Sequence, residues 1–149
     1  MKRILLIDRT EADCALIERM FAENNDTVEI QHLSTMSAVH DFISQCLSTR
    51  VRHLDLPSLI LLDINLPDAK EGLKILEQIQ RSDKLKQIPV FVLSDNSDKD
   101  VIAACYVRGA NGYFLKPTEK IQLSRAVKIL SDRWQQLIQR GFGYHYKAV

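Results

Sequence analysis

Short apolar runs alternate along the chain with longer segments whose apolar residues recur at helical spacing. Runs of four to eight residues rich in Ile, Leu and Val favour strands, whereas apolar residues at every third or fourth position favour amphipathic helices. The pattern predicts strands at residues 3–7, 28–33, 59–63, 90–94 and 112–116. It predicts helices at residues 11–24, 35–48, 72–82, 98–108 and 118–139.

This alternation predicts an α/β fold. Strand–helix repeats build a parallel sheet with right-handed crossovers and helices on both faces. Five such units suit a doubly wound, five-stranded parallel sheet of flavodoxin-like order 2-1-3-4-5. Ligands of such sheets bind outside the carboxyl ends of the strands, beside strand one. The residues that follow the predicted strands are therefore the first place to look for a site.

Length and charge narrow the range of functions. A chain of 149 residues fits a single domain at residues 1–149, in which the last helix, at about 118–139, precedes a short tail at 140–149. The formal net charge of +1 creates no field that would draw nucleic acid or anionic lipid. No apolar run approaches the ~20 residues of a membrane span, and no signal peptide pattern opens the chain. We therefore expect a cytoplasmic protein with no nucleic acid or membrane partner.

The cysteines Cys14, Cys46 and Cys105 are far apart and lack the spacing of zinc ligands. Cys14 and Cys105 fall within amphipathic helical patterns, where free cysteines are commonly buried. We expect thiols in the core or partly buried, and a reducing compartment.

Four complementary polar residues stand at predicted strand ends: Asp8, Asp63, Ser94 and Lys116. Each alone could cap a helix or begin a turn, but four on adjacent strand ends predict a site. A carboxylate can attack phosphorus as a nucleophile, and cations and oriented donors must then neutralise the developing charge. Mg²⁺ prefers oxygen ligands, so Asp8, Asp63 and the backbone carbonyl of Asn65 could form part of a metal site.

The segments "LILLDINLP", "VFVLS" and "GANGYFLKP" resemble the receiver domain of two-component response regulators, over roughly the first 130 residues. The resemblance implies that Asp63 accepts a phosphoryl group from a histidine kinase, and that Ser94 and Lys116 bind its oxygens. It also implies that Asp8 helps to hold Mg²⁺. Tyr113 would change rotamer as the Ser94 hydroxyl shifts toward the phosphoryl group.

A finer resemblance concerns the partners. The long link before the third strand and Trp134 in an extended last helix resemble single-domain regulators that partner bacterial phytochromes. This implies a sensor histidine kinase, of phytochrome type, and a downstream protein contact, or a homodimer, through the face of helix four, strand five and helix five. We also expect the end of the last helix to overhang the sheet and to support such contacts. Its apolar stripe comprises Leu123, Val127, Leu130, Trp134, Leu137 and Ile138.

Arg9 departs from the family pattern, because receivers usually carry a second metal-binding acid at this position. A guanidinium is always charged, so we expect Arg9 to weaken Mg²⁺ binding. Arg9 could pair with Asp63 or Asp95, or it could point into solvent.

Three functions remain open. We favour a stand-alone response regulator that is not an enzyme; the alternative is a pseudo-receiver that binds partners without phosphoryl transfer, because of Arg9. A phosphohydrolase that uses Asp63 as nucleophile is disfavoured, because Asn65 stands where such enzymes need a second aspartate.

Overall fold

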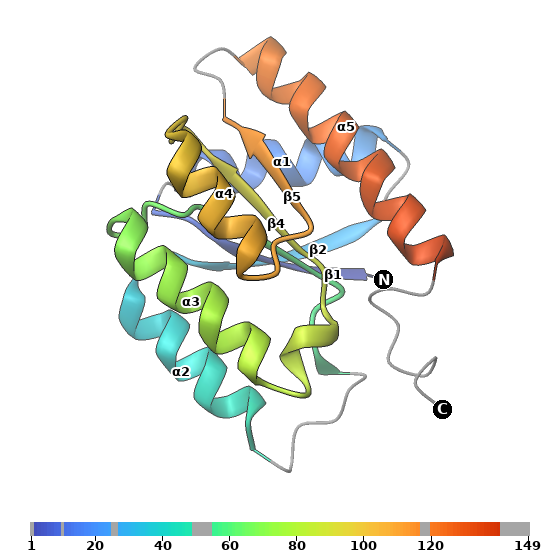
Figure 1. The fold of residues 1–149 in the computed structure, drawn as a ribbon. Helices are drawn as coiled ribbons and strands as arrows, with labels where there is room; N and C mark the ends of the chain where they lie inside the picture. The colour runs from blue at the N-terminus through green and yellow to red at the C-terminus, as the bar shows by residue number, and fades with distance from the viewer. Residues whose placement is uncertain (1, 10, 25–26, 49–54, 117–119, 141–149) are drawn as a thin grey trace.

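Five parallel strands form the sheet at the centre of the molecule, in the order β2-β1-β3-β4-β5 (Figure 1). The computed structural model describes residues 2–9, 11–24, 27–48, 55–116 and 120–140. The strands are β1 (Lys2–Ile7), β2 (Val28–Leu33), β3 (Leu59–Leu62), β4 (Val90–Ser94) and β5 (Gly112–Leu115). The predicted fold class and strand order are thus confirmed.

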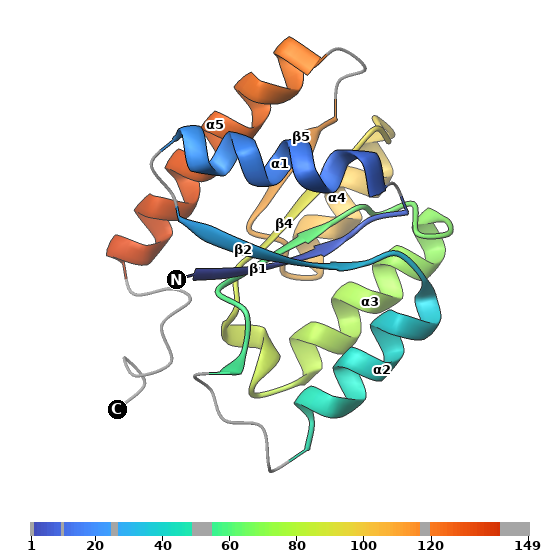
Figure 2. The same ribbon diagram turned by 180° about the vertical axis from the view of Figure 1, so that it is seen from behind.

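Helices cover both faces of the sheet. They are α1 (Glu11–Glu23), α2 (Met36–Cys46), α3 (Ala69–Arg81), α4 (Lys99–Val107) and α5 (Lys120–Gln139), with a short 3-10 helix η2 (Leu85–Gln87) before β4. Helices α2, α3 and α4 lie on one face, and α1 and α5 lie on the other (Figures 1 and 2). In the described part of the chain, no helix is both long and apolar enough to cross a membrane.

The near-continuous apolar runs of the strands reflect this double cover. Successive side chains of a strand point to opposite faces, so β1 sends Leu5 and Ile7 into the core beneath α2, α3 and α4. Ile4 and Leu6 enter the second core, beneath α1 and α5. A strand covered on both sides has no exposed position that a polar residue could occupy, which explains the missing alternation.

Helix α3 begins three residues before the predicted position. The carboxylate of Asp68 caps it by accepting a hydrogen bond from the backbone N–H of Glu71, at 2.9 Å. Gly72 then lies so close to the preceding loop that a Cβ atom would clash with the carbonyl oxygen of Ile64. This close approach fixes the loop after β3, which carries Asp63 and Asn65, against the first turn of α3.

The predicted overhang of α5 is wrong at Trp134, which is fully buried. Its ring packs edge-to-face on Phe21 of α1, with 6.0 Å between ring centroids, and the Lys2 ammonium lies 5.0 Å from the ring centroid. Leu137 and Ile138 are partly buried against the same core. The prediction considered only the sheet as cover for α5, whereas α1 packs on it as well. Of the predicted tail, the part beyond Arg140 lies outside the described residues.

The cysteines behave as expected of core residues. Cys46 and Cys105 are buried and Cys14 is partly buried. Burial raises the pKa of the Cys46 and Cys105 thiols to about 11, so both stay protonated at neutral pH.

Candidate functional site

The four predicted strand-end residues meet at one edge of the sheet. Asp8 follows β1, Asp63 follows β3, Ser94 ends β4 and Lys116 follows β5. Backbone hydrogen bonds hold these ends in line: the Asp63 N–H donates to Ile7 O at 2.8 Å, and the Lys116 N–H donates to Ser94 O at 2.7 Å. Parallel pairing therefore converts four distant sequence positions into one cluster.

Asp8 and Lys116 form a short ion pair inside this cluster. The Lys116 Nζ atom lies 2.6 Å from Asp8 Oδ2, and the two side chains are 14% and 2% exposed. Such a pair must offset the cost of removing both charges from water. His32, at the end of β2, places its Nε2 atom 2.6 Å from the backbone oxygen of Asp8. The first strand end is thus fixed through both its backbone and its side chain.

Asp63 lies half-buried beside this pair. Burial raises the pKa of its carboxyl group, and the nearby charge of Asp8 raises it further. Three groups act in the opposite direction: the Asn65 N–H, which donates to Asp63 Oδ1 at 3.0 Å, the Ser94 hydroxyl and the Lys116 charge. The carboxylate is therefore held by donors and a cation, yet it costs more to ionise than a free aspartate.

Ser94 and Tyr113 lie next to Asp63, on the side of β5. Ser94 is fully buried, and its Oγ atom accepts a hydrogen bond from the Asn96 N–H at 3.2 Å. The Tyr113 hydroxyl donates to the backbone oxygen of Asn96 at 2.6 Å. Burial raises the pKa of Tyr113 to about 12, while its hydrogen bond with Ser94 acts to lower it. Tyr113 thus points inward, toward the strand ends.

Arg9 does not make the predicted ion pair. Among the described residues, no salt bridge joins it to Asp63 or Asp95, and its side chain is exposed. The Asp95 carboxylate instead accepts a hydrogen bond from Asn65 Nδ2 at 3.3 Å. The alternative, in which Arg9 points into solvent, agrees with its exposed side chain, and Lys116 supplies the cation that pairs with Asp8.

The oxygen donors fit Mg²⁺ only in part. Across the described ranges, no group of three or more His, Cys, Asp or Glu side chains could hold a metal ion. Asp8, Asp63 and the backbone carbonyl of Asn65 are the donors on offer, and Asp8 is already paired with Lys116. An octahedral ion would complete its shell with several waters, as Mg²⁺ commonly does.

Sequence reasoning missed the side chains of Asn65 and Asn96, as well as His32. The Asn96 Nδ2 atom donates to Asn65 Oδ1 at 3.1 Å, which connects the loops after β3 and β4. The only signal was the run of polar residues after Ser94, which indicates a loop but does not indicate what that loop contacts.

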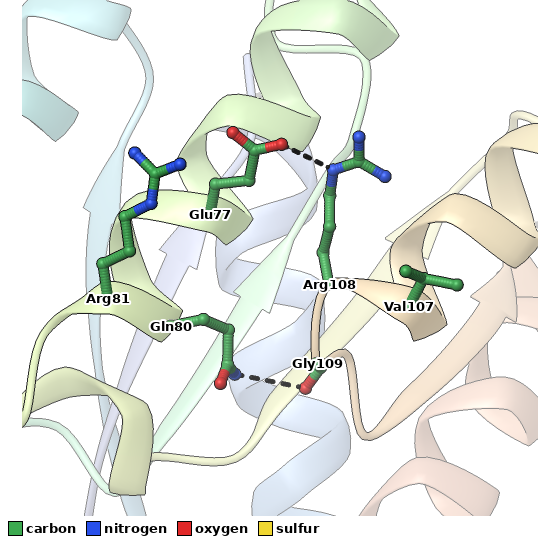
Figure 3. Close-up of a pocket in the computed structure, with 6 residues that line it drawn as sticks. All are labelled: Glu77, Gln80, Arg81, Val107, Arg108 and Gly109. Atoms are coloured by element: carbon green, nitrogen blue, oxygen red, sulfur yellow. Dashed lines mark hydrogen bonds and ion pairs between the residues drawn. The ribbon is translucent and has the colours of Figure 1, made fainter.

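A hollow of about 260 Å³ lies between α3 and α4 (Figure 3), at the end of the sheet opposite to the four site residues. Glu77 forms an ion pair with Arg108 at 2.9 Å across it, and Gln80 Nε2 donates to Gly109 O at 3.4 Å. Asn111, just beyond, bonds the first residue of β4. The hollow therefore sits near the amino ends of the strands and contains none of the site residues.

Known proteins resemble the chain in sequence and in structure. Residues 4–128 match the response regulator receiver domain. The chain is 32% identical over 134 residues to a probable methanogenesis regulatory protein, FilR2, of Methanothrix harundinacea, covering 88% of this chain and 82% of the relative. It is 30% identical over 137 residues to the response regulator Rcp1 of Synechocystis sp., covering 92% of this chain and 91% of Rcp1.

Solved structures of response regulators are also similar to this chain. The phosphorylated cyanobacterial phytochrome response regulator RcpA superposes with a TM-score of 0.75 at 31% identity, covering 90% of this chain and 94% of RcpA. The Mn²⁺-bound form of Rcp1 superposes with a TM-score of 0.76 at 30% identity, with the same coverage of 90% and 94%. The finer resemblance to phytochrome-associated regulators is thereby confirmed as a similarity. The strand-end cluster, the strand order and these matches together establish that the chain belongs to the response regulator receiver domain family.

Proposed function

We propose that this protein is a stand-alone response regulator whose Asp63 accepts a phosphoryl group from a sensor histidine kinase. The observation that carries the proposal is the convergence of Asp63, Ser94 and Lys116 at one sheet edge in a chain of the receiver family. Asp63 is the half-buried acid among them, whereas Asp8 is already committed to Lys116.

The proposed transfer uses the charges of the site directly. An Asp63 carboxylate oxygen forms the new bond to phosphorus, while the P–N bond of the phosphohistidine breaks and the imidazole leaves with a proton from solvent. The Ser94 hydroxyl and the Lys116 ammonium stabilise the phosphoryl oxygens, where negative charge accumulates. Such stabilisation needs groups held in place before the transfer, and the position of Ser94 and Lys116 beside Asp63 supports this role.

A divalent cation would be held by Asp8, Asp63 and the Asn65 carbonyl, and would neutralise charge on the phosphoryl oxygens. The Mn²⁺-bound form of Rcp1 supports this for the family. Arg9 removes one acid from the expected ligand set, so we expect Mg²⁺ to bind weakly.

The relative RcpA is described as a cyanobacterial phytochrome response regulator, and we therefore propose a phytochrome-type kinase as the donor, in the cytoplasm. The output would be a protein contact, or a homodimer, through the face of α4, β5 and α5. Tyr106 of α4 and Leu115 of β5 are large apolar residues exposed there.

The test is incubation with acetyl phosphate and Mg²⁺, followed by intact-mass measurement. We expect the wild type to gain one phosphoryl group and Asp63→Asn to gain none. An adduct that persists in Asp63→Asn would overturn the assignment. Ser82→Ala, which alters a buried serine beside η2 far from the strand ends, should label like the wild type.

The second candidate is a pseudo-receiver that binds partners without phosphoryl transfer. Arg9 is the observation that favours it. If neither the wild type nor Arg9→Asp takes up a phosphoryl group, this candidate replaces the first. Uptake by Arg9→Asp alone would show that Arg9 disables an otherwise complete site.

A further inference from the structure

The loops after β3 and β4 meet beside Asp63, joined by side-chain amides. The Asn65 side chain occupies the centre: its Oδ1 accepts from Asn96 Nδ2 at 3.1 Å, and its Nδ2 donates to Asp95 Oδ1 at 3.3 Å. Its backbone N–H donates to Asp63 Oδ1 at 3.0 Å. One residue thus connects the candidate acceptor with the loop after β4.

Asn96 carries the connection further. Its backbone N–H donates to Ser94 Oγ at 3.2 Å, and its backbone oxygen accepts from the Tyr113 hydroxyl at 2.6 Å. Its Oδ1 atom accepts from the N–H of Asp98, which caps α4, at 3.0 Å. The position of Asn96 therefore fixes the start of α4 and the acceptor for Tyr113 together.

We propose that Asn65 and Asn96 are positioning residues that hold Tyr113 inward before any phosphoryl group is present. The Asn65–Asn96 bond is the latch: it fixes the backbone carbonyl that Tyr113 needs as its partner. The inward state is then the resting state of this chain, rather than a state that only phosphorylation produces. The proposal rests on the proposed function only in taking Asp63 as the phosphoacceptor.

Two physical features support the latch. The amide pair is partly buried, where a hydrogen bond competes less with water. Tyr113 also packs against the core beneath α3 and α4, so an outward rotation would break the Asn96 bond and expose apolar surface together.

The experiment uses the full chain labelled with 3-fluorotyrosine and observed by ¹⁹F NMR, with the Tyr113 line identified from Tyr113→Phe. In the unphosphorylated wild type we expect one Tyr113 line, with a small solvent-isotope shift between H₂O and D₂O. Asn65→Ala and Asn96→Ala should move the line and enlarge that shift. The double variant should add little to either single one, because one bond cannot be lost twice.

Asn24→Ala is the matched control. Asn24 also donates a side-chain hydrogen bond, to Ser131 at 2.9 Å, but on the face covered by α1 and α5. Its substitution should leave the Tyr113 line in place. An unchanged Tyr113 line in both Asn65→Ala and Asn96→Ala overturns the latch, as does a wild-type line with the solvent shift of an exposed tyrosine.

Phosphoryl uptake is measured by mass on the same samples, which separates this proposal from the previous one. The latch predicts that acetyl phosphate changes the Tyr113 line little in the wild type and returns it inward in Asn65→Ala. Absence of uptake would refute the proposed phosphoryl transfer, whereas the comparison of unphosphorylated variants would still decide on the latch.

Discussion

Arg9 is the residue at which this chain departs most clearly from the receiver pattern. It stands where receivers usually carry an acid, so a metal ion beside Asp8 would lose one ligand and would have a cation near it instead. Unit charges ~4 Å apart interact by ~4 kcal/mol at an effective dielectric near 20, and the exposure of Arg9 reduces that figure. A remaining difference of ~1.4 kcal/mol corresponds to tenfold in affinity.

We therefore predict that Arg9→Asp binds Mg²⁺ about tenfold more tightly than the wild type, measured by calorimetry. Arg19→Asp is the control, because it makes the same charge change on the exposed side of α1. Equal affinities in all three proteins would mean that Arg9 has no influence on the metal site. Calorimetry is preferable to fluorescence because the single tryptophan, Trp134, is buried beneath α1.

Asp63 should make stability depend on pH in an unusual direction. Burial raises its pKa above the ordinary value of 3.8, so the folded state binds more protons than the unfolded state between 3.8 and the raised pKa. Stability contributed by this group is present below that interval and lost as pH rises through it.

The prediction is that Asp63→Asn melts at a higher temperature than the wild type at neutral pH, because it removes the buried negative charge. The difference should shrink as the pH falls through the raised pKa toward 3.8, below which Asp63 is mostly protonated in both states. Calorimetric scans of both proteins across this range provide the measurement. A difference that does not vary with pH would assign the effect to packing.

At the residue scale, the sequence predicted which groups would meet but not how they would pair. Asp8, Asp63, Ser94 and Lys116 converge because the topology forces strand ends together. The partner of Lys116 and the direction of Arg9 depend on loop backbone geometry. The Asn65–Asn96 bond depends on it as well, and no periodic pattern encodes it.

At the scale of helices and strands, the sequence likewise predicted where the elements lie but not all of their boundaries and contacts. The helical pattern located α3, but its start depended on the Asp68 cap, which lies before the periodic stretch. The pattern also identified the apolar stripe of α5 and assigned the C-terminal part of it wrongly to an exposed overhang. The pattern shows that a helix face is apolar, but not whether the sheet or another helix covers it.

Trp134 is a core residue in the structure, and its replacement should therefore destabilise the fold. We predict that Trp134→Ala lowers the free energy of unfolding by about 3–5 kcal/mol, the usual range for a buried aromatic, since it removes the packing on Phe21. Ile129→Ala, at a position 55% exposed on the same helix, should change it by no more than about 0.5 kcal/mol. Urea unfolding followed by circular dichroism is suitable, because Trp134→Ala has no tryptophan to report fluorescence. Similar values for both variants would contradict the buried placement.

For the whole molecule, strand order was predicted from the alternation of strands and helices, their right-handed crossovers and the flavodoxin-like arrangement that five units suit. No comparable rule predicts from the sequence which outward-facing residues contact a partner. The partner surface is therefore inferred from the exposure of apolar side chains. Tyr106 of α4 is 47% exposed, and Leu115 of β5 is 52% exposed. The Tyr106 hydroxyl accepts a hydrogen bond from the N–H of Tyr113 in β5 at 3.0 Å, which joins the two elements.

Apolar side chains this exposed favour association, because burial recovers roughly 25 cal/mol per Å². If this face forms a homodimer, Leu115→Asp should weaken self-association at least tenfold in sedimentation velocity, because the interface would bury an unpaired charge. Leu47→Asp is the matched control: Leu47 is 56% exposed but follows α2, on the opposite side of the sheet from α5. Equal weakening by both variants would show that the effect is not specific to the face of α4, β5 and α5. A wild type that stays monomeric at high concentration would contradict the homodimer and leave a different protein as the partner of this surface.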